Sequence, residues 1–327
     1  MATITAAQQQ EIALRQGDAG RARRDRRVRF VRQQVVPRIF LIIMCLIFVM
    51  PFYWMVTQAL KSNEELVRYP PTWFVHDPQW GNFQEATEKI PFWKFARNTI
   101  TVTAAVVIGS LISNPIIAYG FSRVNWPGRD KVFMVVLATV FMPFPAILVA
   151  YVDTWKRISD VSRKDLGINL FGLSIPLPDL PNVGIGTFGP LVIPAFLGSA
   201  FFIFLLRQFM MQIPLDLSDA ARMDGANEWQ IFSGIVMPLT KPALGVIAIL
   251  SGLAAWNDFL GPLIFLLKES LYTLAIGLTF FQSQADRDIK FNLMMAASVL
   301  VVLPVVAIFL FFQRYFISGM TVGSIKG

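Results

Sequence analysis

The sequence has few charged and few reactive side chains. Of its 327 residues only 15% are charged, one is a cysteine, Cys45, and one is a histidine, His76. A lone cysteine excludes an intrachain disulfide framework and any multi-cysteine metal site, and a single histidine excludes a histidine cluster. Because soluble domains carry about 25% charged residues, the low charge also excludes an ordinary water-soluble enzyme.

Apolar residues are abundant instead and form long uncharged runs. The hydrophobic fraction is 55%, and the mean hydropathy is +0.55. A helix needs about 20 apolar residues to cross a bilayer, and six runs reach this length, one of them with a single internal charge at Asp258. They lack the short alternation of barrel strands, so the predicted fold is an all-α polytopic bundle with six transmembrane helices. The runs are Ile39–Leu60, Asn98–Ser122, Val132–Val152, Leu180–Leu206, Pro242–Leu267 and Phe291–Gln313.

The N-terminal tail carries the main charge asymmetry. It holds nine arginines against three acidic residues, Glu11, Asp18 and Asp25. Because basic residues beside a span stay on the cytoplasmic side, the tail predicts a cytoplasmic N-terminus and, after six crossings, a cytoplasmic C-terminus. A nucleic-acid-binding arm is the alternative, but the cluster adjoins a membrane span and contains no binding module. The arginines are Arg15, Arg21, Arg23, Arg24, Arg26, Arg27, Arg29, Arg32 and Arg38.

The chain divides at these runs into three parts: a tail and a first helix, an outer segment, and a core of five further helices. The longest cytoplasmic loop falls inside the core. The predicted bounds are 1–38 for the tail, 39–60 for the first helix, 61–97 for the outer segment, 98–317 for the core with helices at 98–122, 132–152, 186–206, 242–267 and 291–313, 207–241 for the loop, and 318–327 for a cytoplasmic C-terminal tail.

The loop at 207–241 has the signals of two short helices. Asp216 with Asp219 three residues later is an acidic variant of the capping box, and Gly225 suits the position after a helix end. Asn227 with Gln230 is a second capping box. We therefore predict a helix, a glycine turn and a second helix in this loop.

Proline and alanine residues add two expectations. Pro238 is expected to stop the second helix, because proline breaks helix interiors. Ala220 and Ala221 are small enough to let the first helix approach a partner closely. From the residues alone, the element is either a docking plug for a partner's groove or an interfacial helix that packs beneath the bundle.

The loop resembles the signature loop of ABC importer permeases: Glu-Ala-Ala, three residues, Gly, nine residues, Ile, one residue, Leu-Pro. This sequence has the same spacing, with Asp219 for Glu and Met237 for Leu. Other stretches are similar to the maltose-type, carbohydrate-uptake branch, and the resemblance covers nearly all of the chain from about Ile39. The matching stretches are Asp219-Ala220-Ala221, Gly225, Ile235 and Met237-Pro238 in the loop, and Pro51-Phe52-Tyr53-Trp54, Trp256-Asn257-Asp258-Phe259 and Gln313-Arg314-Tyr315-Phe316 elsewhere.

The resemblance implies a multi-pass subunit of the bacterial inner membrane, surrounded by lipid and working by alternating access. Its partners would be a second, different permease subunit, two cytoplasmic ABC ATPase subunits and an extracytoplasmic solute-binding protein. ATP and Mg²⁺ would bind the ATPase subunits, because this chain has no Gly-x4-Gly-Lys-Ser/Thr phosphate loop. The chain itself is expected to bind no cofactor and no metal, and to catalyse no reaction.

The resemblance also implies roles within the loop. The acid would make polar or ionic contacts at the ATPase cleft, the two alanines would allow close approach, and the glycine would set the turn. The isoleucine and the last proline would hold the second helix against the membrane domain. The predicted ATPase-coupling residues are Asp219, Ala220, Ala221, Asp224, Gly225, Ile235 and Pro238.

Five further residues are candidate contacts of the solute pathway or of a partner. Asp258, beside Asn257, is the one ionisable residue inside a predicted span, and such residues are costly in hydrocarbon. We expect Asp258 either to face the pathway or to make an interhelical hydrogen bond to the partner permease. Phe280, Phe281 and Gln282 combine the aromatic faces and polar groups that a sugar pathway needs, or else they anchor a helix end.

The leading hypothesis is thus an ABC permease for a carbohydrate, expected to be an oligosaccharide. One alternative is a permease of the same branch for another solute such as glycerol phosphate. The other is an ion-coupled secondary transporter, which should show several intramembrane charges and an inverted repeat; only Asp258 qualifies, and no repeat is evident.

Overall fold

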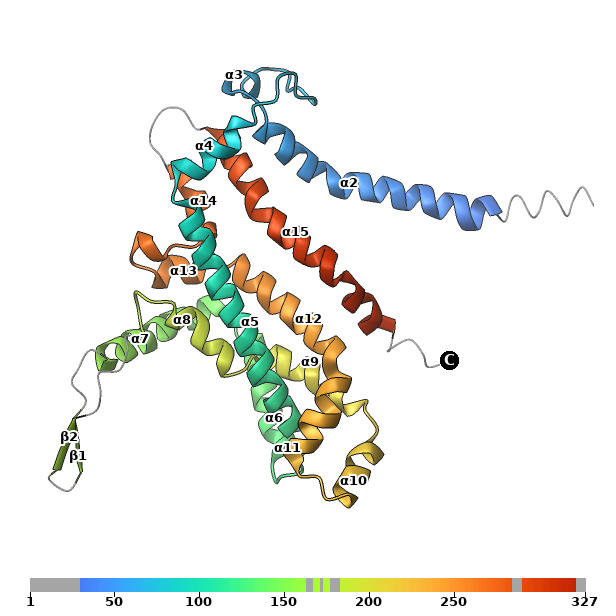
Figure 1. The fold of residues 1–327 in the computed structure, drawn as a ribbon, viewed down its shortest axis with the longest axis vertical. Coiled ribbons are helices and arrows are strands. Elements are labelled where there is room, and N and C mark those ends of the chain that lie inside the picture. The colour runs from blue at the N-terminus through green and yellow to red at the C-terminus, as the bar shows by residue number, and fades with distance from the viewer. Residues whose placement is uncertain (1–29, 163–166, 171–172, 177–182, 284–289, 322–327) are drawn as a thin grey trace, which may run out of the picture.

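The computed structural model describes residues 30–162, 167–170, 173–176, 183–283 and 290–321. Most of this part of the chain is helical, and α5 runs through the middle of the bundle (Figure 1). The elements are η1 (Val31–Val35), α2 (Val36–Ala59), α3 (Asn63–Leu66), α4 (Gly81–Lys89), α5 (Phe92–Ser122), α6 (Arg129–Ala138), η2 (Thr139–Phe141), α7 (Phe144–Ser162), β1 (Gly167–Leu170), β2 (Leu173–Pro176), α8 (Gly189–Val192), η3 (Ile193–Phe196), α9 (Ala200–Met211), α10 (Leu215–Met223), α11 (Glu228–Ile231), η4 (Phe232–Val236), α12 (Met237–Trp256), α13 (Leu260–Phe265), η5 (Glu269–Leu271), α14 (Leu274–Ser283) and α15 (Phe291–Thr321).

The predicted all-α polytopic fold is confirmed. Within the described residues, five helices have the length and apolar composition to cross a membrane, and a pair bent by 103°, 129–141 and 144–160, brings the number to six when it is counted as one broken span. The bend falls at Met142, whose backbone is extended because Pro143 follows it. The straight spans are Gln33–Ala59, Phe92–Ser122, Gly189–Met211, Glu228–Trp256 and Phe291–Phe311.

The predicted span at 242–267 is wrong at both ends. The helix begins at Glu228 and ends at Trp256, so Pro238 does not stop it. Pro238 lies in the first turn of α12, directly after the π-helical turn η4. There its missing N–H costs little, and the wider turn accommodates the ring. A charge-free run cannot reveal this start, because the helix passes through Glu228 and Lys241 before its apolar part.

Two hydrophobic clusters hold the bundle together. The first joins α5, α9, η4 and α12, and the second joins the start of α5 to α4, α14 and α15. Their fully buried members include Leu206, Met210, Val236 and Ile247 in the first cluster and Phe95, Leu293, Ala296 and Ala297 in the second.

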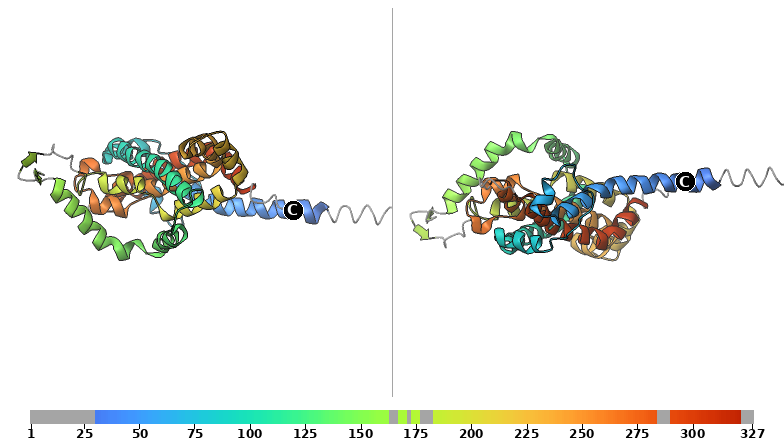
Figure 2. Two further views of the ribbon diagram at one scale, coloured as in Figure 1. Left: turned by 90° about the horizontal axis from the view of Figure 1, so that it is seen from below. Right: turned by 90° about the horizontal axis from the view of Figure 1, so that it is seen from above.

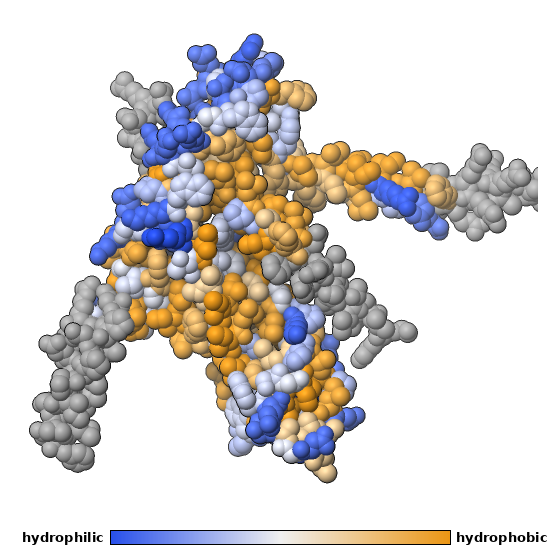
Figure 3. Space-filling view, viewed as in Figure 1, coloured by the Kyte–Doolittle hydropathy of each residue, from blue (hydrophilic) through white to orange (hydrophobic). Residues whose placement is uncertain are grey.

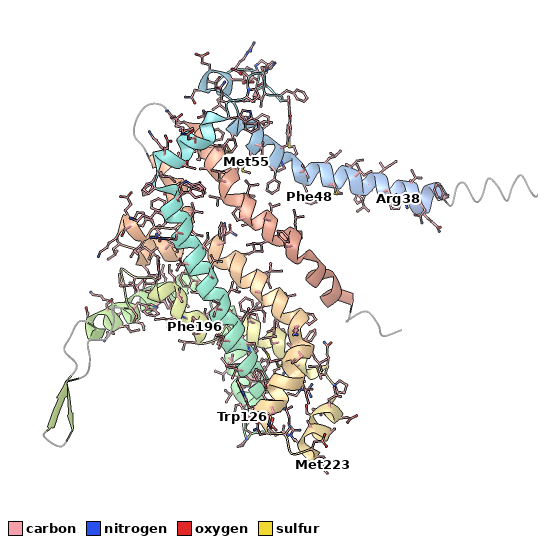
Figure 4. All side chains as sticks on the ribbon, in the orientation of Figure 1. Arg38, Phe48, Met55, Trp126, Phe196 and Met223 are labelled. Atoms are coloured by element: carbon pink, nitrogen blue, oxygen red, sulfur yellow. The ribbon has the colours of Figure 1, made fainter. Side chains whose placement is uncertain are left out.

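The first span lies largely apart from these clusters. None of its apolar window is buried, and Phe48 is 72% exposed. Figures 1 and 2 show α2 extending away from the other helices, and Figure 4 shows Phe48 on this free stretch. Figure 3 shows the same apolar character along α2 and over the middle of the bundle, with hydrophilic residues gathered at the α3 and α4 end. Such surface is stable only against lipid or another apolar helix.

The ends of the chain differ from the predicted tails. Residues 1–29 of the predicted tail 1–38, and 322–327 of the tail 318–327, lie outside the described residues. Helical structure begins at Val31 and α15 continues to Thr321. In the outer segment after α7, β1 pairs antiparallel with β2, and residues 177–182 are also outside the described residues.

Buried polar side chains connect the spans to one another. Asn114 of α5 is fully buried; its Oδ1 accepts the backbone N–H of Ser199 at 2.7 Å, and its Nδ2 donates to Ser110 O at 2.8 Å. Arg123, just after α5, donates to the carbonyls of Met210 and Ile213 at the end of α9. These bonds satisfy backbone groups at both ends of α9, which have no partner within the helix.

Asn114→Leu is expected to destabilise the purified protein by about 1–2 kcal/mol, because the Ser199 N–H is left buried without an acceptor. Thermal unfolding in detergent measures this. Thr101→Val is the matched control, since the Thr101 hydroxyl is exposed and bonds only within its own helix. Equal unfolding temperatures for the two variants contradict the proposed role of Asn114.

Candidate docking element at one end of the bundle

Helix α10 lies at the end of the bundle opposite α3 and α4 (Figure 1), and Figure 4 shows Met223 at its tip. The helix begins after Pro214, which occupies the capping position and makes no side-chain cap. Asp216 therefore does not form the predicted capping box. It lies in the first turn, where a negative charge is favoured by the helix dipole.

Gly225 ends α10 as predicted. Its backbone φ is +85°, a left-handed conformation that residues other than glycine and asparagine rarely adopt. The N–H of Gly225 donates to Arg222 O at 3.0 Å, and the N–H of Ala226 donates to Ala221 O at 2.9 Å. This bond pair is a Schellman motif, so the turn is set by backbone geometry.

The second helix starts at the predicted capping box. Asn227 Oδ1 accepts the N–H of Gln230 at 2.9 Å, and Gln230 Oε1 accepts the N–H of Asn227 at 2.8 Å. The reciprocal pair satisfies two backbone donors at the helix start. The prediction of two helices around Gly225 is therefore confirmed.

A polar network ties this element to α5. Asp219 pairs with Arg222 at 2.7 Å, and Arg222 Nε pairs with Glu228 Oε1 at 2.9 Å. Glu228 Oε2 accepts the hydroxyl of Tyr119 at 2.5 Å. The hydrogen bond from Arg222 to Glu228 raises the pKa of Arg222 above its ordinary value, although desolvation acts in the opposite direction. The guanidinium therefore bridges both helices of the element.

Apolar packing seats the second helix. Ile231, Phe232 and Val236 are buried in the first cluster, and the ring of Phe232 lies 5.1 Å from that of Tyr119. Ile235 is half-buried and Pro238 is exposed. Within this chain, the three buried side chains hold the helix to the bundle more than Ile235 and Pro238 do.

The outward side of the element is exposed. Asp219, Ala220 and Asp224 are exposed, while Ala221 is half-buried against the first cluster. Large apolar side chains share this exposure: Leu215 (60%), Leu217 (45%), Met223 (89%) and Trp229 (64%). An apolar surface next to acidic groups at the tip of the molecule is typical of a protein contact site.

Sequence reasoning missed Tyr119, Arg222 and Glu228. The spacing of Asp219 and Arg222 on one helix face is a local signal for an ion pair. Tyr119 gives no such signal, because 109 residues separate it from Glu228.

The five candidate pathway residues occupy different environments. Asp258 lies after the end of α12, where its Oδ1 accepts the N–H of Gly261 at 3.0 Å. Exposed Asn257 donates to Leu253 O of its own helix. Phe281 is only 6% exposed, and half-buried Phe280 packs on Phe95 and Tyr272. The side chain of Gln282 is outside the described residues.

Residues 105–322 match the family of binding-protein-dependent transport system inner membrane components. The chain belongs to this family. It is similar to the arabinooligosaccharides transport system permease protein AraQ of Halalkalibacterium halodurans, with 32% identity covering 85% of this chain and 91% of that protein. It is also similar to the melibiose/raffinose/stachyose import permease protein MelC of Bacillus subtilis, with 29% identity covering 92% of this chain and 100% of that protein.

The fold agrees with this membership. A chain of a bacterial ABC transporter involved in the import of alginate superposes with a TM-score of 0.68 at 22% identity, covering 86% of this chain and 95% of that chain. As a member of the family, this protein is a multi-pass inner-membrane component of a transport system that depends on a binding protein. It is a transport subunit and not an enzyme.

Gly225→Val is expected to reduce binding of the ATPase subunits that the loop's resemblance implies, about tenfold or more, because a β-branched residue does not adopt φ near +85°. Gly225→Asn is the matched control and should bind normally, since asparagine tolerates this conformation and no other atom lies within 4 Å of an added Cβ. Co-purification from membranes measures both. Normal binding by Gly225→Val means that the turn does not set the docking surface.

Tyr119→Phe is expected to loosen α10, because Glu228 loses a hydrogen-bond donor worth about 1 kcal/mol. Trypsin should then cleave after Arg222 about fivefold faster. Tyr53→Phe removes the same group at the opposite end of the molecule, where Tyr53 donates to Trp73 O, and should leave this cleavage rate unchanged. If trypsin cleaves after Arg222 at the same rate in Tyr119→Phe and Tyr53→Phe, the Tyr119 hydrogen bond does not hold α10 in place.

Proposed function

We propose that this protein is the permease subunit of an ATP-driven importer for a carbohydrate of oligosaccharide size. Its relatives AraQ and MelC are described by the oligosaccharides that their systems transport, and a third relative, DasC of Streptomyces coelicolor, is a diacetylchitobiose uptake permease at 26% identity. Similarity over most of each chain supports the same class of solute here.

The proposed assembly contains one copy of this chain, a second and different permease subunit, two ABC ATPase subunits and an extracytoplasmic solute-binding protein. ATP and Mg²⁺ bind the ATPase subunits, and this chain holds neither. Both termini lie in the cytoplasm, because the arginine-rich tail precedes the first span. Lipid surrounds the bundle, and nucleic acid is not a ligand.

The observation that carries this proposal is the exposed α10 surface joined to a transmembrane helix. Asp219 and Ala220 face outward on α10, and the Arg222 to Glu228 to Tyr119 contacts connect α10 to α5. A partner that moves α10 therefore also moves α5. Closure of the ATPase dimer on ATP binding would drive the bundle from inward-open to outward-open, and hydrolysis would reverse it.

One relative favours a second candidate solute. The sn-glycerol-3-phosphate transport system permease protein UgpE of Pectobacterium atrosepticum is 26% identical over 88% of this chain. Glycerol phosphate differs from an oligosaccharide in size and in charge. An ion-coupled secondary carrier, by contrast, is not supported by the family membership.

Affinity purification of this chain from its native membrane tests the proposal. We expect an ABC ATPase, a second permease and a binding protein to be identified by mass spectrometry. Solute uptake should also stop when ATP is depleted while the membrane potential is held. Recovery of the chain alone, with uptake that persists without ATP, overturns the proposal.

A further inference from the structure

Residues 67–76, between α3 and α4, form an aromatic loop at the end of the molecule opposite the docking element (Figure 1). Tyr69, Trp73 and Phe74 of this loop are exposed, Tyr69 to 91% and Phe74 to 75%. A groove of about 660 Å³ lies between the loop and α2, with Tyr53 of α2 in its lining. Exposed apolar surface of this kind marks contact with another apolar surface.

Three contacts hold the aromatic loop against the last turns of α2. The hydroxyl of Tyr53 donates to Trp73 O at 2.7 Å, and the rings of Trp54 and Trp73 lie 5.4 Å apart. The ammonium group of Lys61, which is only 1% exposed, donates to Thr72 O at 2.5 Å. The loop therefore lies beside the helix and does not extend freely beyond it.

Several polar groups of the loop are paired within the protein. The hydroxyl of Thr72 donates to Glu65 Oε1 at 2.9 Å, and His76 Nδ1 lies 3.3 Å from the same oxygen. Pro70 and Pro71 have no N–H group that would need an acceptor. The groove beside α2 is therefore mainly apolar.

The length of α2 places this surface at the edge of the hydrocarbon. The uncharged run Ile39–Leu60, between Arg38 and Lys61, is about 33 Å long at 1.5 Å per residue, close to the hydrocarbon thickness of about 30 Å. Lys61 therefore lies at the bilayer surface, and Tyr53 lies up to about 12 Å deeper along the helix. The loop bonds to both residues, so it lies within the interfacial layer, where tryptophan and tyrosine side chains are favoured.

The charge of the loop favours lipid over another apolar helix as its partner. Arg68 is exposed next to Tyr69, and it forms no ion pair within the part of the chain that the structure describes. A guanidinium held unpaired against an apolar helix is costly, whereas lipid phosphates at this depth supply acceptors for it. A soluble partner approaches from the water, but this surface lies beside α2 within the thickness of the bilayer.

We propose that the aromatic loop binds the lipid headgroup layer of the leaflet at this end of the molecule. The rings of Tyr69, Trp73 and Phe74 lie between the headgroups and the acyl chains, and Arg68 pairs with a lipid phosphate. Lipid thereby fixes the end of α2, whose apolar window is not buried by the rest of the bundle. This goes beyond the proposed function, since it holds for any solute.

Quenching by spin-labelled lipids tests the proposal in the protein purified with its partner subunits from the native membrane and placed in lipid nanodiscs. Cys45, exposed on α2, is replaced by alanine, and this protein without an added thiol gives the background from the other subunits. Phe74→Cys carries a nitrobenzoxadiazole label in the loop. The reference positions are Phe48→Cys, on the exposed middle of α2, and Glu64→Cys, exposed on α3.

Nitroxides near the lipid headgroup should quench the Phe74→Cys label about threefold more than the Glu64→Cys label, because the loop lies in the interfacial layer. Aqueous iodide should show the reverse order, and nitroxides near the middle of the bilayer should quench the Phe48→Cys label most. Tyr69→Cys should behave like Phe74→Cys. Arg68→Glu should lower the lipid quenching at Phe74→Cys about twofold, since lipid phosphates repel a carboxylate.

Two results overturn the proposal. The first is iodide quenching at Phe74→Cys equal to that at Glu64→Cys with no quenching by lipid, which places the loop in water, within reach of a soluble partner. The second is protection of the Phe74→Cys label from both quenchers, which means that a protein subunit covers the loop. Neither result bears on the proposed function, which fails instead through missing partner subunits or through uptake that persists without ATP.

Discussion

Backbone amide and carbonyl groups cannot remain unpaired in hydrocarbon, and this constraint determines the rest of the structure. It makes every crossing helical and restricts interruptions to places where other groups replace the lost bonds. Asn114 supplies such a bond to Ser199 at the start of α9, and Asp258 supplies one to Gly261 at the start of α13. The interruptions are therefore stable.

The helix α5 connects the docking element to a cleft among the spans that Ser110, Ser199 and Asp258 line. Tyr119, near its end, holds the docking element through Glu228, and Ser110, nine residues earlier, lines the cleft. At 1.5 Å per residue these positions are about 14 Å apart along one continuous helix, which contains Pro115 between them. Movement of α10 by a partner can therefore reach the middle of the bundle without an intermediate element, and this is the physical basis of the proposed coupling.

Local signals in the sequence were reliable where the chemistry is local. The Asn227 and Gln230 capping box and the Gly225 turn form as predicted, because each involves residues within five positions of one another. The uncharged runs in the sequence located the apolar segments of the chain. They misplaced the span predicted at 242–267, because the helix that forms there starts at Glu228, among charged residues. The expected stop at Pro238 failed because the preceding π-helical turn accommodates its ring.

The sequence by itself thus determined the fold class and the two short helices around Gly225, since hydrophobic length and capping residues are both read along the chain. The tertiary structure alone decided which side chains meet. It joined Tyr119 to Glu228, placed Phe281 in the core, and brought Asp258 together with Ser110 and Ser199 in one cleft. These contacts join residues that are tens to more than a hundred positions apart, and no periodic or local pattern encodes which distant helices pack together.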